Sequence, residues 1–98
     1  MIKLSVMYPN SDGATFDMDY YLSSHTPMVQ RTLGAALKGL SVDQAEAGQG
    51  PYLVICHLLF DSLEALQAAV GVHGPTIMAD IPNYTNAQPT MQVSEMKL

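Results

Sequence analysis

The sequence has little cysteine and no long apolar run. Its 98 residues include one cysteine, Cys56, so no disulfide can form within the chain. Because Cys56 lies in an apolar segment, we interpret it as a small buried residue of a protein in the reducing cytoplasm. No segment approaches the ~20 apolar residues of a membrane span, and the start lacks a signal-peptide pattern. We therefore expect a cytoplasmic protein with no membrane partner.

Basic residues are also few. Four of them, scattered along the chain, stand against nine acidic residues and give a net charge of −5. This distribution offers no basic patch for nucleic acid. The three histidines, His25, His57 and His73, lack the short spacings of metal ligands, and no phosphate-binding glycine motif or nucleophile elbow is present. We therefore expect no metal, no cofactor and no covalent catalysis.

The composition that remains is that of one folded domain, spanning residues 1–98. A hydrophobic share of 48% and a mean hydropathy of +0.11 are enough for a core. Alternation of apolar residues predicts strands over 2–8, 37–46, 52–60 and 90–97. Helical periodicity predicts a first helix over 15–34. A second helix opens at Asp61-Ser62, with Leu63, Leu66 and Val70 as its buried stripe.

Glycine and proline residues predict where the helices are interrupted. Gly34 ends the first helix, and Pro27 either kinks it or restarts it with Thr26 as the cap. Gly71 and Gly74-Pro75 break the second helix, and a short helical piece follows over 75–79. Residues 81–86 are predicted to be loop.

The predicted order βαββαβ is that of an α+β, ferredoxin-like fold, with a four-stranded antiparallel sheet and two helices on one face. The third strand is apolar on both of its faces, however, apart from His57. Two helices cover only one face of a sheet, and a strand buried on both faces needs a second cover. We therefore predict a homodimer in which a second copy covers the helix-free face.

The first helix carries the main candidate for chemistry. On a helical wheel, seven mostly apolar residues share an arc roughly 140° wide. They are Met18, Tyr21, Leu22, Met28, Val29, Thr32 and Leu33. His25 lies in the middle of this arc, and Tyr20 lies on the polar side. An inward histidine is either a core residue bonded to the protein or a general acid or base that faces a cavity between helix and sheet.

Phe16, Tyr20-Tyr21, His25 and Pro27 together resemble the signature of the EthD family. The similarity includes Met1-Ile2-Lys3-Leu4 to Tyr8-Pro9, His25-Thr26-Pro27-Met28, Leu59-Phe60-Asp61-Ser62 and Ala79-Asp80-Ile81-Pro82-Asn83-Tyr84-Thr85. The resemblance implies a dimeric α+β barrel and places His25 at the centre of the motif. Some members of the family resemble isomerases or cyclases that work by proton transfer, so it favours a catalytic His25.

Asp80 is the second catalytic candidate. It is either a surface residue that caps the turn into Pro82 or, because of its place in the family match, a carboxylate that orients the His25 ring. Candidate substrate-binding residues are Tyr21, Met28, His57 and Tyr84. His57 is also explained as a core or interface residue and Tyr84 as a loop anchor. His73 is expected in an exposed loop.

These features predict a small enzyme that acts without a cofactor on an apolar carbonyl, lactone or aromatic-like metabolite. The chemistry is acid–base transfer by His25, or oxygen or redox chemistry on an activated substrate in an apolar pocket. The alternative is a non-catalytic homodimer that binds such a ligand as a carrier or accessory protein.

Overall fold

The computed structural model describes all 98 residues and contains one four-stranded sheet. Its strands are β1 (Ile2–Pro9), β2 (Gly39–Gln44), β3 (Tyr52–Phe60) and β4 (Thr90–Glu95). They are antiparallel and lie in the order β2-β3-β1-β4, which places the two most apolar strands at the centre. The predicted α+β, ferredoxin-like fold is confirmed. The second strand is shorter than the predicted 37–46.

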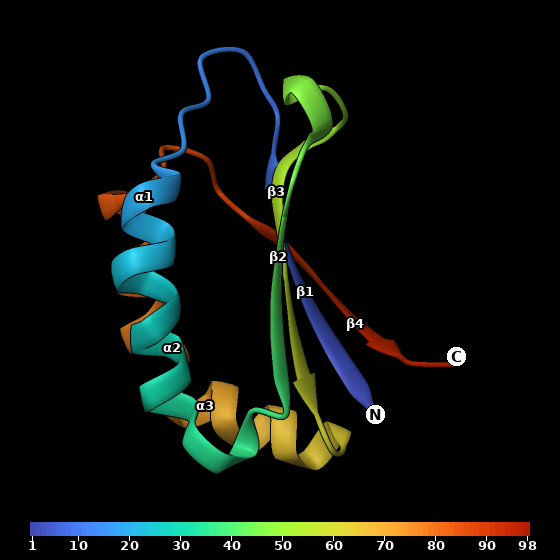
Figure 1. Cartoon of the computed structure of the whole chain (residues 1–98). Helices are drawn as coiled ribbons and strands as arrows, with labels where there is room; N and C mark the ends of the chain where they lie inside the picture. The colour runs from blue at the N-terminus through green and yellow to red at the C-terminus, as the bar shows by residue number, and fades with distance from the viewer.

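The first helix is one continuous run built from three segments (Figure 1). These are α1 (Met18–Tyr20), the π-helical turn η1 (Tyr21–His25) and α2 (Thr26–Leu33). The Asp17 side chain caps the run by accepting a hydrogen bond from the Tyr20 backbone N–H at 3.0 Å. The run ends as predicted at Gly34, whose positive φ of 56° favours glycine. The short 3₁₀ turn η2 (Gly34–Ala36) follows.

The π turn corrects two details of the predicted helix. Pro27 does not restart the helix with a Thr26 cap, because Thr26 itself has helical dihedral angles and its N–H bonds to the Tyr21 carbonyl. This i→i+5 bond lowers the angular advance per residue, so a regular wheel no longer describes the face beyond Tyr21. Leu22, which was expected to face inward, is consequently 52% exposed.

The second helix, α3 (Leu63–Ala79), is unbroken, so the predicted interruption at Gly71 and Gly74-Pro75 is wrong. Pro75 removes a donor to the Gly71 carbonyl, but both residues are exposed, and water can take the place of the missing N–H. Ser62 caps α3 by accepting from the Ala65 N–H at 3.1 Å. His73 therefore lies half-buried within a helix rather than in an exposed loop.

The buried side of α3 also differs from the prediction. Leu66 is buried as expected, but Ala69 takes the neighbouring buried position. Leu63 and Val70 are 46% and 37% exposed. Within the predicted loop after α3, residues Ile81–Asn83 form the 3₁₀ turn η4, and another such turn, η3 (Glu46–Gly48), joins β2 to β3. No helix of the chain has the length and apolar character that crossing a membrane requires.

Both helices lie on one face of the sheet, and the other face is open (Figure 1). The core between them includes Leu4 and Tyr8 of β1 and the alternate residues Val54, Cys56, Leu58 and Phe60 of β3. Leu53, Ile55, His57 and Leu59 point to the open face and are only half-buried. The third strand is therefore apolar on a face that this chain leaves uncovered.

Candidate acid–base site

His25 and Asp80 form a direct contact. His25 ends the π turn η1, and Asp80 lies between the last residue of α3 and the first residue of η4. The His25 Nδ1 and Asp80 Oδ2 atoms are 2.8 Å apart, although 55 residues separate them in the sequence. His25 is 4% exposed, and the Asp80 side chain is 17% exposed. The structure thus brings together the two residues proposed as catalytic.

Asp80 also binds two further donors. The Tyr20 hydroxyl donates to Asp80 Oδ1 at 2.7 Å, and the Asn83 side-chain amide donates to the same oxygen at 2.9 Å. Burial pushes the Asp80 pKa upward, but the hydrogen bonds from Asn83, Tyr20 and His25 outweigh it and leave the pKa below its ordinary value. Asp80 is therefore a carboxylate at neutral pH, and it can act only as an acceptor.

This carboxylate fixes the state of the His25 ring. Because Asp80 accepts, neutral His25 must carry its proton on Nδ1, which leaves a lone pair on Nε2. Nε2 has no hydrogen-bond partner in the protein, whereas every fully enclosed side-chain nitrogen and oxygen has one. Nε2 is therefore not sealed in the interior. A histidine held in this way has one nitrogen available to take up or release a proton.

Aromatic rings surround His25. Its ring stacks on Tyr21, with centroids 5.0 Å apart and an interplanar angle of 18°, and its centroid is 4.6 Å from that of Tyr84. The Tyr84 and Tyr8 hydroxyls are 2.6 Å apart. Burial raises the pKa of Tyr8, Tyr21 and Tyr84, and also that of the Cys56 thiol. These groups stay protonated near neutral pH, so they supply walls and hydrogen bonds rather than bases or nucleophiles.

The structure does not show the predicted cavity between the first helix and the sheet. The aromatic rings fill that space, and His25 lines none of the five main pockets. Met28 instead lines an outer cleft of about 320 Å³, together with Tyr20, Ser24, Thr76, Ala79 and Asp80. Tyr84 borders a separate surface pocket of about 570 Å³ beside Phe16. The cleft lined by Asp80 is thus the pocket that borders the His25–Asp80 pair.

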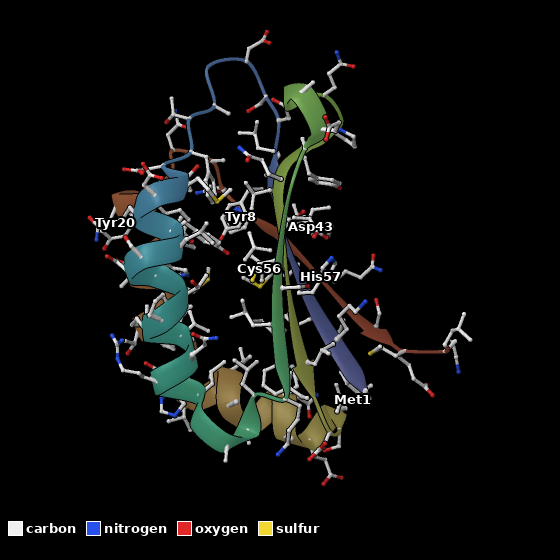
Figure 2. The ribbon with its side chains drawn as sticks, in the orientation of Figure 1. Met1, Tyr8, Tyr20, Asp43, Cys56 and His57 are labelled. Atoms are coloured by element: carbon white, nitrogen blue, oxygen red, sulfur yellow. The ribbon has the colours of Figure 1, made fainter.

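His57 lies away from the other site residues, on the open face of the sheet. Figure 2 shows it beside Asp43 on the side opposite Tyr8 and Cys56. Its Nδ1 is 2.9 Å from the Ser5 hydroxyl oxygen, and its Nε2 is 3.5 Å from Asp43 Oδ2. The sheet separates His57 from His25, so this chain does not place the two histidines in one site.

Tyr20 and Asn83 are the site residues that the sequence reasoning missed. A regular wheel places Tyr20 on the polar side of the helix. In the structure it points outward from α1, away from the sheet, where it reaches Asp80 (Figure 2). Asn83 lies three residues after Asp80, a spacing common in turns, and this was the available signal.

No three His, Cys, Asp or Glu side chains come together in the arrangement of a metal site. No family model and no curated protein matches the sequence. Among solved structures, an EthD-like protein from Ralstonia eutropha is 39% identical, with a TM-score of 0.87 over 99% of this chain and 92% of that one.

Two more distant structures share the fold. An ethyl tert-butyl ether degradation (EthD) family protein from Bacillus halodurans is 19% identical, with a TM-score of 0.66 and 98% coverage of both chains. SnoaB from Streptomyces nogalater, described as a cofactor-independent oxygenase, is 6% identical, with a TM-score of 0.67 over 99% of this chain and 93% of that one.

Proposed function

Because this chain belongs to the EthD family, we propose that it is a homodimeric enzyme that works by proton transfer. Its substrate is an apolar carbonyl, lactone or aromatic-like metabolite, and it needs no cofactor. His25 carries the proton on Nε2, and Asp80 holds Nδ1. The observation that supports this proposal is the 2.8 Å contact between a buried imidazole and an ionised carboxylate, with the second ring nitrogen free.

The surroundings of His25 support an apolar substrate. Tyr21 and Tyr84 offer aromatic surfaces next to the ring, and Met28 lines the cleft that borders Asp80. None of the three presents a charge, so a weakly acidic C–H or O–H group is a better partner for Nε2 than a polar, charged metabolite. Removal of a proton from such a group yields an enolate or phenolate. This first step is common to isomerisation, cyclisation and oxygen chemistry.

The open face of the sheet supports the homodimer. Half-buried Leu53, Ile55 and Leu59 of β3 and Met7 of β1 lie there without a cover. Apolar side chains gathered on an uncovered sheet face are typical of a protein–protein interface. A second copy offers the same surface in return, as two-fold symmetry requires.

The His25→Leu variant tests the proposed function. Leucine fills a similar volume, and Asp80 can replace the lost donor with water because its side chain is 17% exposed. We expect a folded protein at a cost below ~1.5 kcal/mol, with turnover reduced by ~10²–10⁴-fold. The His73→Leu variant, altered at the half-buried histidine of α3, should keep full activity.

The substrate for this assay can be found by native mass spectrometry of small molecules that copurify with the protein. Wild-type turnover in the His25→Leu variant would refute the proposal. Tight binding of a copurifying molecule, unchanged by His25→Leu and without conversion at any pH, would instead indicate a non-catalytic carrier.

A further inference from the structure

Asp80 is held by residues from two separate parts of the chain. Its Oδ1 atom accepts from both Tyr20 and Asn83, whereas its Oδ2 atom is left to His25 alone. Rotation of the carboxylate about its Cβ–Cγ bond moves both oxygens together, so the rotation that takes Oδ2 away from His25 also disrupts the two bonds to Oδ1. The donors on Oδ1 therefore determine where Oδ2 points.

The two donors on Oδ1 do different work. Asn83 lies three residues after Asp80, so its bond is local to the turn η4 and ties Asp80 to its own segment. Tyr20 lies 60 residues away and belongs to the same helical run as His25. Its bond joins that run to the end of α3. Of the two donors on Oδ1, only Tyr20 fixes the carboxylate relative to the helical run that carries the His25 ring.

The π turn explains how one helix presents both residues to one carboxylate. Tyr20 and His25 are five residues apart, which in a regular α-helix at 100° per residue places them ~140° apart, on different faces. In η1 the Thr26 N–H bonds to the Tyr21 carbonyl, and this i→i+5 pattern places residues five apart closer in angle than a regular α-helix does. The turn thus brings both side chains within reach of Asp80, where Tyr20 contacts Oδ1 and His25 contacts Oδ2.

We propose that Tyr20, presented by the π turn, is the positioning residue that holds Asp80 against His25 and so keeps the proton of His25 on Nδ1. The role of this residue in catalysis rests on the proposed function, but the contact and its effect on the ring do not. The hydrogen bond to Asp80 raises the pKa of Tyr20, so the hydroxyl remains a donor at neutral pH.

The test is Tyr20→Phe in the full chain, observed by NMR without a substrate. Imidazole ¹⁵N shifts report the His25 tautomer, and side-chain carboxyl ¹³C shifts report the Asp80 pKa. We expect the fraction of His25 protonated on Nε2 to rise several-fold and the Asp80 pKa to move up. The control is Tyr52→Phe, because Tyr52 makes no side-chain hydrogen bond and lies on β3, away from Asp80. It should change neither signal.

Unchanged His25 tautomer and Asp80 titration in folded Tyr20→Phe would overturn the proposal, even if the variant is less stable. If Tyr20→Phe does not fold, the pKa of Tyr20 is measured instead, in the wild type and in the Asp80→Asn variant. A Tyr20 pKa that falls in Asp80→Asn supports the contact, and an equal value in both proteins refutes it. Since neither readout needs turnover, a failure of the proposed enzyme activity is recognised separately.

Discussion

The hydroxyl pair of Tyr8 and Tyr84 allows a quantitative test of how the aromatic wall beside His25 is held. The two oxygens are 2.6 Å apart, and the residues are 2% and 3% exposed. Their contact joins β1 to the turn after η4 across 76 residues of sequence. The Tyr84 ring also lies against His25, so the bond helps to set one side of the candidate site.

Tyr→Phe removes one hydroxyl and keeps the ring, so no cavity opens. Each single variant leaves the other hydroxyl buried with a lost partner, which costs ~1–3 kcal/mol. The double variant removes both polar groups at once, and its rings can still pack edge to face. We therefore expect the double variant to be more stable than the sum of the two single losses predicts, with a coupling energy of ~1 kcal/mol or more.

Chemical denaturation of the wild type, Tyr8→Phe, Tyr84→Phe and the double variant measures this coupling. All samples need the same protein concentration, because the proposed dimer would make the measured stability depend on concentration. Each kcal/mol corresponds to a shift of ~4–8 °C in Tm for a domain of this size. Tyr52→Phe serves as the control, because Tyr52 is half-buried and makes no side-chain hydrogen bond. Losses that add to within ~0.3–0.5 kcal/mol would show that the bond does not couple the two residues.

Two further predictions concern charge and assembly. Because the folded-state pKa of Asp80 lies below its unfolded value, Asp80 stabilises the fold above the unfolded pKa, and this contribution is lost as the pH falls through the folded pKa. In acid, the free energy of unfolding should therefore depend less on pH in Asp80→Asn than in the wild type, whereas Asp19→Asn should keep the wild-type dependence. Equal slopes of unfolding free energy against pH in the two variants would contradict the lowered pKa of Asp80. Ile55→Glu on the open face should yield monomer or aggregate, whereas Val72→Glu on exposed α3 should keep the wild-type state. A wild type that sediments only near 10.6 kDa at micromolar concentration would refute a dimer burying ~1,000 Å² or more.

The fold could be predicted because its signals are repetitive and local. Alternation in β1 and the apolar run of β3, broken only by His57, locate the central strands, and short turns leave one order of elements. The helix break at Gly71 and Gly74-Pro75 was wrong for a physical reason. Helix propensity sums the cost of each residue taken alone. The helix α3, however, is stabilised by the packing of Leu66 and Ala69 and by the Ser62 cap. The carbonyl that lacks a donor because of Pro75 faces water.

The candidate site could be predicted only in part. The inward position of His25 follows from periodicity, since Tyr21 and Val29 on the same side are buried as well. Its contact with Asp80 joins residues 55 positions apart, and no local pattern encodes such a distance. Tyr20 was missed because a regular wheel places it far from His25, and only the π turn brings the two together.

The irregular turn of the first helix carries residues of the candidate site. Pro27 has no N–H to donate, and in a regular helix its ring clashes with the carbonyl of residue 23. The wider turn lies just before Pro27, and in it the Thr26 N–H bonds to the Tyr21 carbonyl in place of the usual i→i−4 bond. The same change of pitch presents Tyr20 and His25 to one carboxylate. The adjacent tyrosines, the histidine and the proline two residues later thus lie in or beside this one turn, and Tyr20 and His25 both contact Asp80.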